Sequence, residues 1–306
     1  MKYQNELRLP TYVVDWLKFD EYDHSVDPFT VSATGLMKPV RAHYLAMRHA
    51  DELEMDVSEL LAAKYGTAIH DSFSKIQTEG VLKEQRVTKQ LLVNGTTYTI
   101  SGKFDILELQ NNKWTIRDIK TTSVWAYIYG GKDDDYSKQL SVYRWLLNNN
   151  PLLEGKELND IACIDFLFTD WQSSKAKQDP DYPQHRINPG YKINLMTLAE
   201  TEEYIFGRVS MFDSFRNVKD DDLPACSKEE LWSTEDTFAV FSKENKRATK
   251  VCSSEQEAQM YIVDKKVKNA YIEFRPAKAK RCKYCAATNH CGQFLELSRL
   301  GLIELY

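Results

Sequence analysis

The chain has 306 residues, of which 42% are hydrophobic and 28% are charged, as in an ordinary soluble globular protein. Its formal net charge of −5 excludes a protein that is basic throughout, so any nucleic-acid surface must be local. No apolar run reaches the about 18 residues of a membrane helix, and the first residues carry no secretion signal. The six cysteines all lie in the second half of the chain. We therefore expect a reducing, cytoplasmic location and no membrane partner.

The first third of the chain is predicted to be mostly helical. Residues 1–30 have few periodic apolar positions and are predicted to be irregular. A helix is predicted over 32–54, where Ser32 provides a cap signal. A second helix is predicted over 58–80, capped by Ser58 and closed by Gly80.

Strands dominate the next part of the chain. Residues 86–120 are β-rich, with a hairpin at Asn94-Gly95 and a second turn at 110–112. The remaining elements, in order, are a helix over 136–150, strands over 161–172 and 191–196, a helix over 197–216, and a hairpin with a helix over 237–266. This order predicts an α/β fold with a mixed central sheet flanked by helices. A polar break divides it into a core of residues 1–223 and a small C-terminal module of residues 224–306.

Two carboxylates and a lysine fall close together in the β-rich part. Asp118 and Lys120 are two apart on one strand, so they point to the same face, and the hairpin can bring Asp105 near them. Mg²⁺ or Mn²⁺ needs only one or two carboxylates, and a lysine beside it can hold water or stabilise developing charge. These residue types suit phosphodiester hydrolysis. A surface salt bridge between strands would give the same pattern.

Four motifs in sequence order sharpen this interpretation. They are Gly66 to His70 (G-x-x-x-H), Gly102 to Asp105 (G-x-x-D), Asp118 to Lys120 (D-x-K) and Gln139 to Tyr143 (Q-x-x-x-Y). With this spacing, the chain resembles the RecB-type branch of the PD-(D/E)XK nuclease superfamily over residues 30–150. The resemblance implies a restriction-endonuclease-like core and a DNA nuclease. Residues 167–187 and 223–232 bear a softer resemblance to small phage exonucleases, which implies a bacterial or phage-infected cell.

The resemblance also implies roles for these residues. The metal ligands would be His70, Asp105, Asp118 and the carbonyl of Ile119, and Lys120 would orient or activate water. Gln139 and Tyr143 lie on one helical face and would hold the lysine or the nucleic-acid backbone. The alternatives are a core histidine for His70 and ordinary helix packing for Gln139 and Tyr143.

Three cysteines form a compact C-x2-C-x5-C motif, which suits a metal centre. They are Cys282, Cys285 and Cys291. In AddB-type and CRISPR-associated RecB-like nucleases, this motif holds a [4Fe–4S] cluster with a fourth cysteine near the N-terminus. Here Lys38 precedes Pro39 in place of that cysteine, so we expect Cys226 to replace it, with Cys252 and His290 as alternatives. Zn²⁺ and free thiols are the other possibilities, and either metal would be structural.

Two regions are candidates for nucleic-acid binding. Residues 239–285 carry twelve Lys or Arg against five Asp or Glu, and Lys246 and Arg247 lie in this stretch. Trp125 and its tyrosine neighbours could stack on the bases of a single strand, with Tyr143 as a further contact. The alternatives are that the basic stretch is an ordinary solvated surface and that the aromatic residues belong to the core.

We therefore predict a Mg²⁺- or Mn²⁺-dependent deoxyribonuclease. An exonuclease on single strands or duplex ends, in recombination, repair or replication, is the first hypothesis, with a helicase, a recombinase or a single-strand-binding protein as partner. The alternatives are a structure-specific endonuclease, an inactive DNA-binding module, and an adaptor held together by the cysteine metal.

Overall fold

A computed structural model describes residues 1–20, 27–243 and 245–304. The chain divides into two compact units, neither of which is continuous in sequence. The larger unit comprises residues 3–37 and 55–216, and the smaller comprises residues 1–2, 38–54 and 217–306. Residues 38–54, which the sequence led us to assign to the N-terminal core, thus group with the C-terminal part of the chain. The short strands β1 (Lys2–Gln4) and β3 (Glu54–Asp56) lie where the chain passes between the units.

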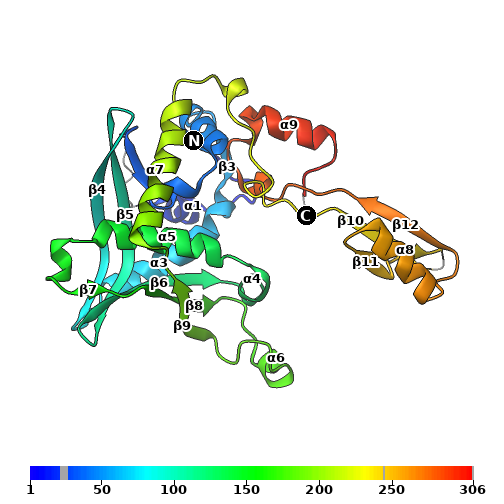
Figure 1. Ribbon diagram of the computed structural model, residues 1–306, viewed down its shortest axis with the longest axis horizontal. Coiled ribbons are helices and arrows are strands. Elements are labelled where there is room, and N and C mark those ends of the chain that lie inside the picture. The colour runs from blue at the N-terminus through cyan, green and yellow to red at the C-terminus, as the bar shows by residue number, and fades with distance from the viewer. Residues whose placement is uncertain (21–26, 244, 305–306) are drawn as a thin grey trace. The chain divides into compact units, whose positions relative to one another are not determined.

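The larger unit is built on a mixed sheet, as the sequence predicted (Figure 1). Its strands are β2 (Thr30–Ser32), β4 (Val81–Val93), β5 (Thr96–Gln110), β6 (Lys113–Thr122), β7 (Glu157–Leu158), β8 (Ile161–Phe168) and β9 (Ile187–Asn194). Their order is β2-β5-β6-β8-β9, with β4 paired to β5 and β7 to β6. β6 runs antiparallel to β5 but parallel to β8, which makes the sheet mixed. Both predicted hairpins form, and the left-handed backbone of Asn94 and Gly95 is the one that a two-residue turn requires.

Helices flank this sheet. They are α1 (Thr11–Lys18), α3 (Leu61–Ser74), α4 (Val124–Tyr129), α5 (Asp133–Leu147), α6 (Ser173–Gln178) and α7 (Leu198–Phe215), with short 3₁₀ turns η1 (Gly35–Met37), η2 (Val57–Leu60) and η3 (Pro151–Leu153). α5 packs on β5 and on α7, while α3 contacts β4 and β6 (Figure 1). A capping box starts α7, because Thr197 accepts from the Glu200 amide and the Glu200 carboxylate accepts from the Thr197 amide.

Two sequence predictions for the N-terminal third were wrong, and a third was confirmed over a shorter range. The helix predicted over 32–54 is only α2 (Val40–Arg48), because Pro39 forces the preceding residue out of helical geometry and becomes the N-cap. The helix predicted over 58–80 is confirmed as α3, but none of its residues is buried, so its apolar stripe does not form core. α1 occupies part of the stretch that was predicted to be irregular.

The smaller unit contains α2 and most of the C-terminal part of the chain. Its elements are β10 (Thr237–Ser242), β11 (Lys250–Cys252), α8 (Glu255–Asp264), β12 (Ala270–Arg275), α9 (Gly292–Arg299) and the turns η4 (Asp220–Asp222), η5 (Arg281–Tyr284) and η6 (Thr288–His290). The three strands form an antiparallel sheet in the order β11-β10-β12, and α8 packs on it around Val240, Cys252 and Ala258. Within the described ranges, no helix has the length and apolar character needed to span a membrane.

Candidate active site

The site lies where the neighbours of β5 change. One edge of β5 pairs with β2 up to Ser101 and then with β6 from Ile106 onward. Residues 102–105, the G-x-x-D motif, occupy the gap between these two ladders. Backbone groups on this edge of β5 and at the end of β6 are therefore free to bond with side chains.

Asp105 uses this gap to reach across to β6. Its Oδ2 accepts a hydrogen bond of 2.8 Å from the amide of Ile119. In a strand, the N–H and C=O of one residue point to the same neighbour, so the Ile119 carbonyl also faces the gap. Asp118, only 2% exposed, stands in line with Asp105 just beyond the last paired residues, Ile106 and Arg117. The place where β5 and β6 separate, here called the fork, thus brings together two carboxylates and a carbonyl oxygen.

His70 reaches the same place from α3. Its Nδ1 lies 2.8 Å from Glu84 Oε1 and 3.6 Å from Asp105 Oδ1. One ligand atom from each of His70, Glu84 and Asp105 lies within 4.8 Å of the others. Asp118 falls outside this tight group. The structure therefore brings the predicted residues His70 and Asp105 together and adds a glutamate to them.

Glu84 was missed by the sequence analysis. Although it lies within β4, its backbone is left-handed, with φ of 52°. By the register of its neighbours it stands opposite Asp105, yet it makes no ladder pair there. Its second carboxylate oxygen lies 2.7 Å from Lys103 Nζ. A strained non-glycine backbone of this kind is characteristic of functional sites, and no sequence pattern signals it.

Lys120 supplies the positive charge of the site. Its Nζ lies 2.6 Å from Asp118 Oδ2. Apart from this ion pair, Asp118 Oδ2 has no hydrogen-bond partner among the described residues. Burial opposes the charged form of the lysine, but the Asp118 carboxylate raises its pKa above the ordinary value. Lys120 therefore stays a cation beside an incompletely satisfied carboxylate.

Burial and neighbouring charges shift the pKa values of the ionisable residues of the site. Burial, and then the neighbouring Asp118, raise the pKa of Asp105 to about 7. The hydrogen bond that the His70 imidazole donates to Glu84 raises the pKa of His70. Burial would raise the pKa of Glu84, but the hydrogen bonds of His70 and Lys103 hold it below its ordinary value. Carboxylate oxygens together with one imidazole are a ligand set that suits Mg²⁺ or Mn²⁺.

Gln139 and Tyr143 lie together on α5, as predicted. Gln139 Nε2 donates a hydrogen bond of 3.0 Å to the hydroxyl of Tyr143. The Tyr143 ring is only 5% exposed and packs against Gly102. A Cβ at Gly102 would lie 2.8 Å from Cδ1 and Cε1 of Tyr143, so the motif glycine makes room for the motif tyrosine.

The four predicted cysteines line one pocket of the smaller unit. These are Cys226, Cys282, Cys285 and Cys291. Gln293 of α9 clamps Cys226 by accepting from its amide at 2.8 Å and donating to its carbonyl at 3.0 Å. Burial, followed by Glu230 and neighbouring cysteines, raises the pKa of Cys226 to about 12. Their sulfur atoms do not form a group of three or more within 4.8 Å of one another in the described chain, so no closed metal site is preformed.

The alternative fourth ligands have other neighbours. Cys252 is buried in the core of the β10–β12 sheet. The ring of His290 stacks on that of His49, with 3.9 Å between the ring centres and 7° between the planes. His49 in turn lies 2.6 Å from a carboxylate oxygen of Asp220. These contacts leave Cys226 as the candidate that shares a pocket with the C-x2-C-x5-C cysteines.

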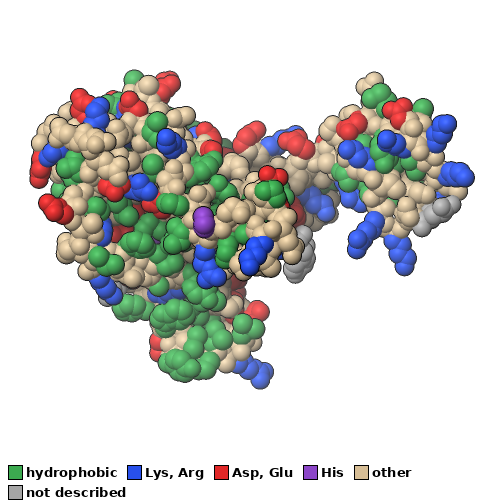
Figure 2. All heavy atoms as spheres, turned by 90° about the horizontal axis from the view of Figure 1, so that it is seen from below, with side chains coloured by type: hydrophobic (Ala, Val, Ile, Leu, Met, Phe, Trp, Pro, Cys, Tyr) green, Lys and Arg blue, Asp and Glu red, His purple; other side chains and the backbone are tan. Residues whose placement is uncertain are grey.

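The predicted nucleic-acid contacts divide between the two units. Trp125 is 43% exposed, stacks on exposed Tyr129 with 5.9 Å between ring centres, and has Lys175 Nζ 4.7 Å from its own ring centre. Lys246 and Arg247 are exposed in the turn between β10 and β11. Figure 2 shows Lys and Arg side chains over the surface of β10–β12 and α8. The alternative of core burial is thus wrong for Trp125.

Carboxylates, an imidazole and a lysine gathered at a forked sheet define a candidate metal-dependent hydrolytic site. Residues 57–292 match the PD-(D/E)XK nuclease superfamily. Because the match spans most of the chain, the protein belongs to this superfamily of metal-dependent nucleases. The superfamily predicted from the four motifs is thereby confirmed.

Structural comparison gives only a distant likeness. Eleven chains of solved structures match. One, described as "Crystal structure of SSO0001", is 19% identical, with a TM-score of 0.44, and the match covers 64% of this chain and 81% of that chain. No curated protein matches the sequence. The family assignment therefore depends on the sequence match over residues 57–292.

Proposed function

We propose that this protein is a Mg²⁺- or Mn²⁺-dependent deoxyribonuclease. The observation that carries the proposal is the pair of carboxylates, partly buried Asp105 and buried Asp118, at the fork of β5 and β6 beside Lys120. His70, Asp105, Asp118 and the Ile119 carbonyl would hold the metal. Bound there, a divalent cation neutralises phosphate charge and lowers the pKa of a water molecule.

The chain's own residues fit such an ion. Asp118 Oδ2 lacks a well-aligned donor among the described residues, so a cation would satisfy it. Burial and Asp118 raise the pKa of Asp105, so a cation bound beside it would stabilise its charged form. Glu84 fixes the orientation of His70 through Nδ1, which leaves Nε2 available to the metal.

Lys120 would act on the substrate rather than on the metal. It remains a cation at the edge of the site, where it can hold a phosphate oxygen or orient the attacking water. Gln139 and Tyr143 would support this arrangement through the packing of Tyr143 on Gly102. No covalent intermediate is needed, since water is the nucleophile.

We further propose an exonuclease that acts on single strands or duplex ends. The exposed stack of Trp125 and Tyr129 supports this, because unpaired bases stack on such rings whatever their sequence. The exposed Lys246 and Arg247 are suited to phosphate contacts. A role in recombination, repair or replication, a helicase, recombinase or single-strand-binding partner, and the AddB-type, CRISPR-associated or phage subtype stay predictions.

A cleavage assay on end-labelled linear DNA and covalently closed circular DNA tests both proposals. With Mg²⁺ or Mn²⁺, the parent protein should degrade linear DNA, and Asp118→Ala should not. Lys113→Ala, on the same strand but exposed and paired to Glu157, is the matched control and should cleave normally. Cutting of circles would replace the exonuclease by the endonuclease. Absence of cleavage with either metal would leave an inactive DNA-binding module.

We also propose that Cys226, Cys282, Cys285 and Cys291 hold a structural [4Fe–4S] cluster. Their shared pocket supports this. A four-cysteine zinc site needs sulfurs about 3.8 Å apart, from Zn–S bonds of about 2.3 Å, and a cluster needs them wider. The metal content of the protein therefore distinguishes the two kinds of site.

Metal analysis of anaerobically purified protein tests the cysteine site. We expect iron and sulfide in the parent protein, loss of both in Cys226→Ser, and full content in the matched control Cys163→Ser. Zinc in place of iron would support the zinc alternative. A metal-free parent protein would leave free thiols and remove the proposal.

A further inference from the structure

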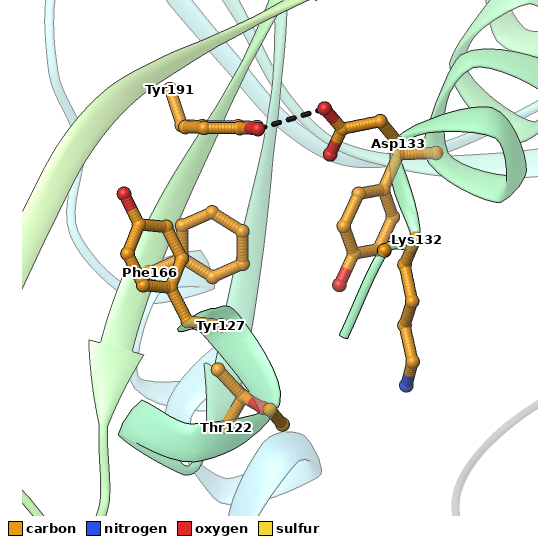
Figure 3. Close-up of a pocket in the computed structure, with 9 residues that line it drawn as sticks. Thr122, Tyr127, Lys132, Asp133, Phe166 and Tyr191 are labelled. Atoms are coloured by element: carbon orange, nitrogen blue, oxygen red, sulfur yellow. Dashed lines mark hydrogen bonds between the residues drawn. The ribbon is translucent and has the colours of Figure 1, made fainter. Parts of the chain in front are cut away.

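A pocket opens beside Lys120 at the end of β6 (Figure 3). Side chains alternate along a strand, so Thr122, which lines the pocket, lies on the same side of β6 as Lys120. Phe166, another lining residue, is the β8 residue paired with Lys120. The ring centre of Tyr136, also in the lining, lies 5.9 Å from Lys120 Nζ. The pocket therefore adjoins the proposed catalytic lysine.

The walls of this pocket are aromatic rings held in place by one another. Ring centres of Tyr127 and Phe166 are 5.0 Å apart, and those of Phe166 and Tyr191 are 5.5 Å apart. The Tyr127 hydroxyl accepts a hydrogen bond of 2.9 Å from Asn188. The Tyr191 hydroxyl donates one of 2.8 Å to Asp133, as Figure 3 shows. Because these contacts exist before any ligand enters, binding would cost little ordering of the walls.

The pocket has no net charge that would select a phosphate. The carboxylate of Asp133, next to the hydroxyl of Tyr191, and the ammonium of Lys132 both line it and offset one another. Aromatic walls with a few hydrogen-bonding groups instead suit a flat, neutral heteroaromatic ring. In a nucleotide, the base stands one sugar away from its phosphate. A base in the pocket would therefore bring its phosphate toward Lys120.

We infer that this pocket binds the base of the nucleotide next to the scissile phosphate. The inference deepens the proposed nuclease function and depends on it for the position of the phosphate. Base stacking on aromatic side chains tolerates any sequence, which suits a nuclease that must cut successive nucleotides. The pocket would hold each new strand end in register with the metal site.

Abasic substitution tests this inference. Single-stranded oligonucleotides would differ only in one abasic nucleotide, moved stepwise past the cleaved bond. For the parent protein, kcat/KM should fall about ten-fold when the abasic nucleotide reaches the pocket. Tyr136→Leu should abolish this difference between intact and abasic strands, while Tyr136→Phe, which keeps the ring, should retain it. Tyr12→Leu, a change of a 76% exposed tyrosine on α1, is the matched control and should also retain it.

The outcomes separate the pocket from the nuclease function. An equal abasic penalty in the parent protein and in Tyr136→Leu would overturn the inference, as would no penalty at any position. If Tyr136→Leu does not fold, Thr122→Leu, which narrows the pocket, should abolish the penalty instead. If the parent protein cleaves nothing, the proposed function fails by itself. The pocket is then judged by fluorescence anisotropy with Asp118→Ala, in which the Kd of the abasic strand should be about ten-fold higher than that of the intact strand.

Discussion

Substitution by alanine should have opposite effects on stability at the two motif glycines, Gly66 and Gly102. A Cβ at Gly102 would lie 2.8 Å from carbons of Tyr143 and Leu146. Carbon atoms prefer a separation of about 3.5–4.0 Å, so these side chains would have to move by about 1 Å. Both are buried, at 5% and 2% exposure, and have no room to do so. Gly102→Ala should therefore destabilise the larger unit by about 1–3 kcal/mol.

Gly66→Ala is the matched change at the other motif. Nothing lies within 4 Å of a Cβ built at Gly66, which sits inside α3. Alanine favours helix over glycine by about 0.5–1 kcal/mol, so this variant should be slightly more stable than the parent protein. Because the chain has two compact units, a single melting temperature would mix them. Hydrogen exchange of amides in β5 and α3 reports on each site separately.

The contrast also separates packing from substrate contact. Faster exchange of β5 in Gly102→Ala and slower exchange of α3 in Gly66→Ala are the expected results. Unchanged exchange of β5 in Gly102→Ala would refute the packing argument. Loss of DNA cleavage in a stably folded Gly66→Ala would indicate that Gly66 leaves room for the substrate rather than for the fold.

Other expectations follow from the charges of both units. Glu84→Gln should weaken Mn²⁺ binding about ten-fold, because His70 Nδ1 loses its carboxylate partner. Calorimetry without DNA measures this affinity. An unchanged affinity would mean that Glu84 plays no part in metal binding. Lys120→Ala should reduce the cleavage rate at least about 100-fold, while the DNA affinity measured by anisotropy stays near that of the parent protein. Weaker DNA binding would mean that Lys120 contributes to affinity rather than to the chemical step. Asp220 raises the pKa of His49, and His49 lowers that of Asp220. Their ion pair therefore stabilises most from about pH 4 to about 6.5 and is lost as pH rises through the raised pKa of His49. His49→Gln should flatten thermal stability between about pH 6 and 8, and an unchanged pH profile would contradict this assignment.

Local signals predicted much of the larger unit. The turns at Asn94-Gly95 and at 110–112 contain residues that adopt the left-handed backbone easily, so both hairpins could be predicted from a few positions. The helix over 197–216 carried its own capping box. The motif residues could be placed in one site because two of them lie on the same hairpin.

Long-range features could not be predicted in the same way. The contribution of Glu84 depends on the register between β4 and β5 and on a backbone conformation that glutamate rarely adopts. The apolar stripe of α3 correctly predicted a helix, but no partner buries it. The grouping of residues 38–54 with the C-terminal part of the chain depends on contacts more than 170 residues apart, such as that of Arg48 with Asp220.

These distant contacts set an order of events during synthesis. Buried Arg41 donates hydrogen bonds to the carbonyls of Leu223 and Pro224, which lie 182 and 183 positions later in the chain. At about 5–20 residues per second, a ribosome needs about 9–36 s to make that length. Residues 55–216 of the larger unit are complete before α2 meets its partners. Cys282, Cys285 and Cys291 emerge later still, so the nuclease fold can form before the cysteine site can receive any metal.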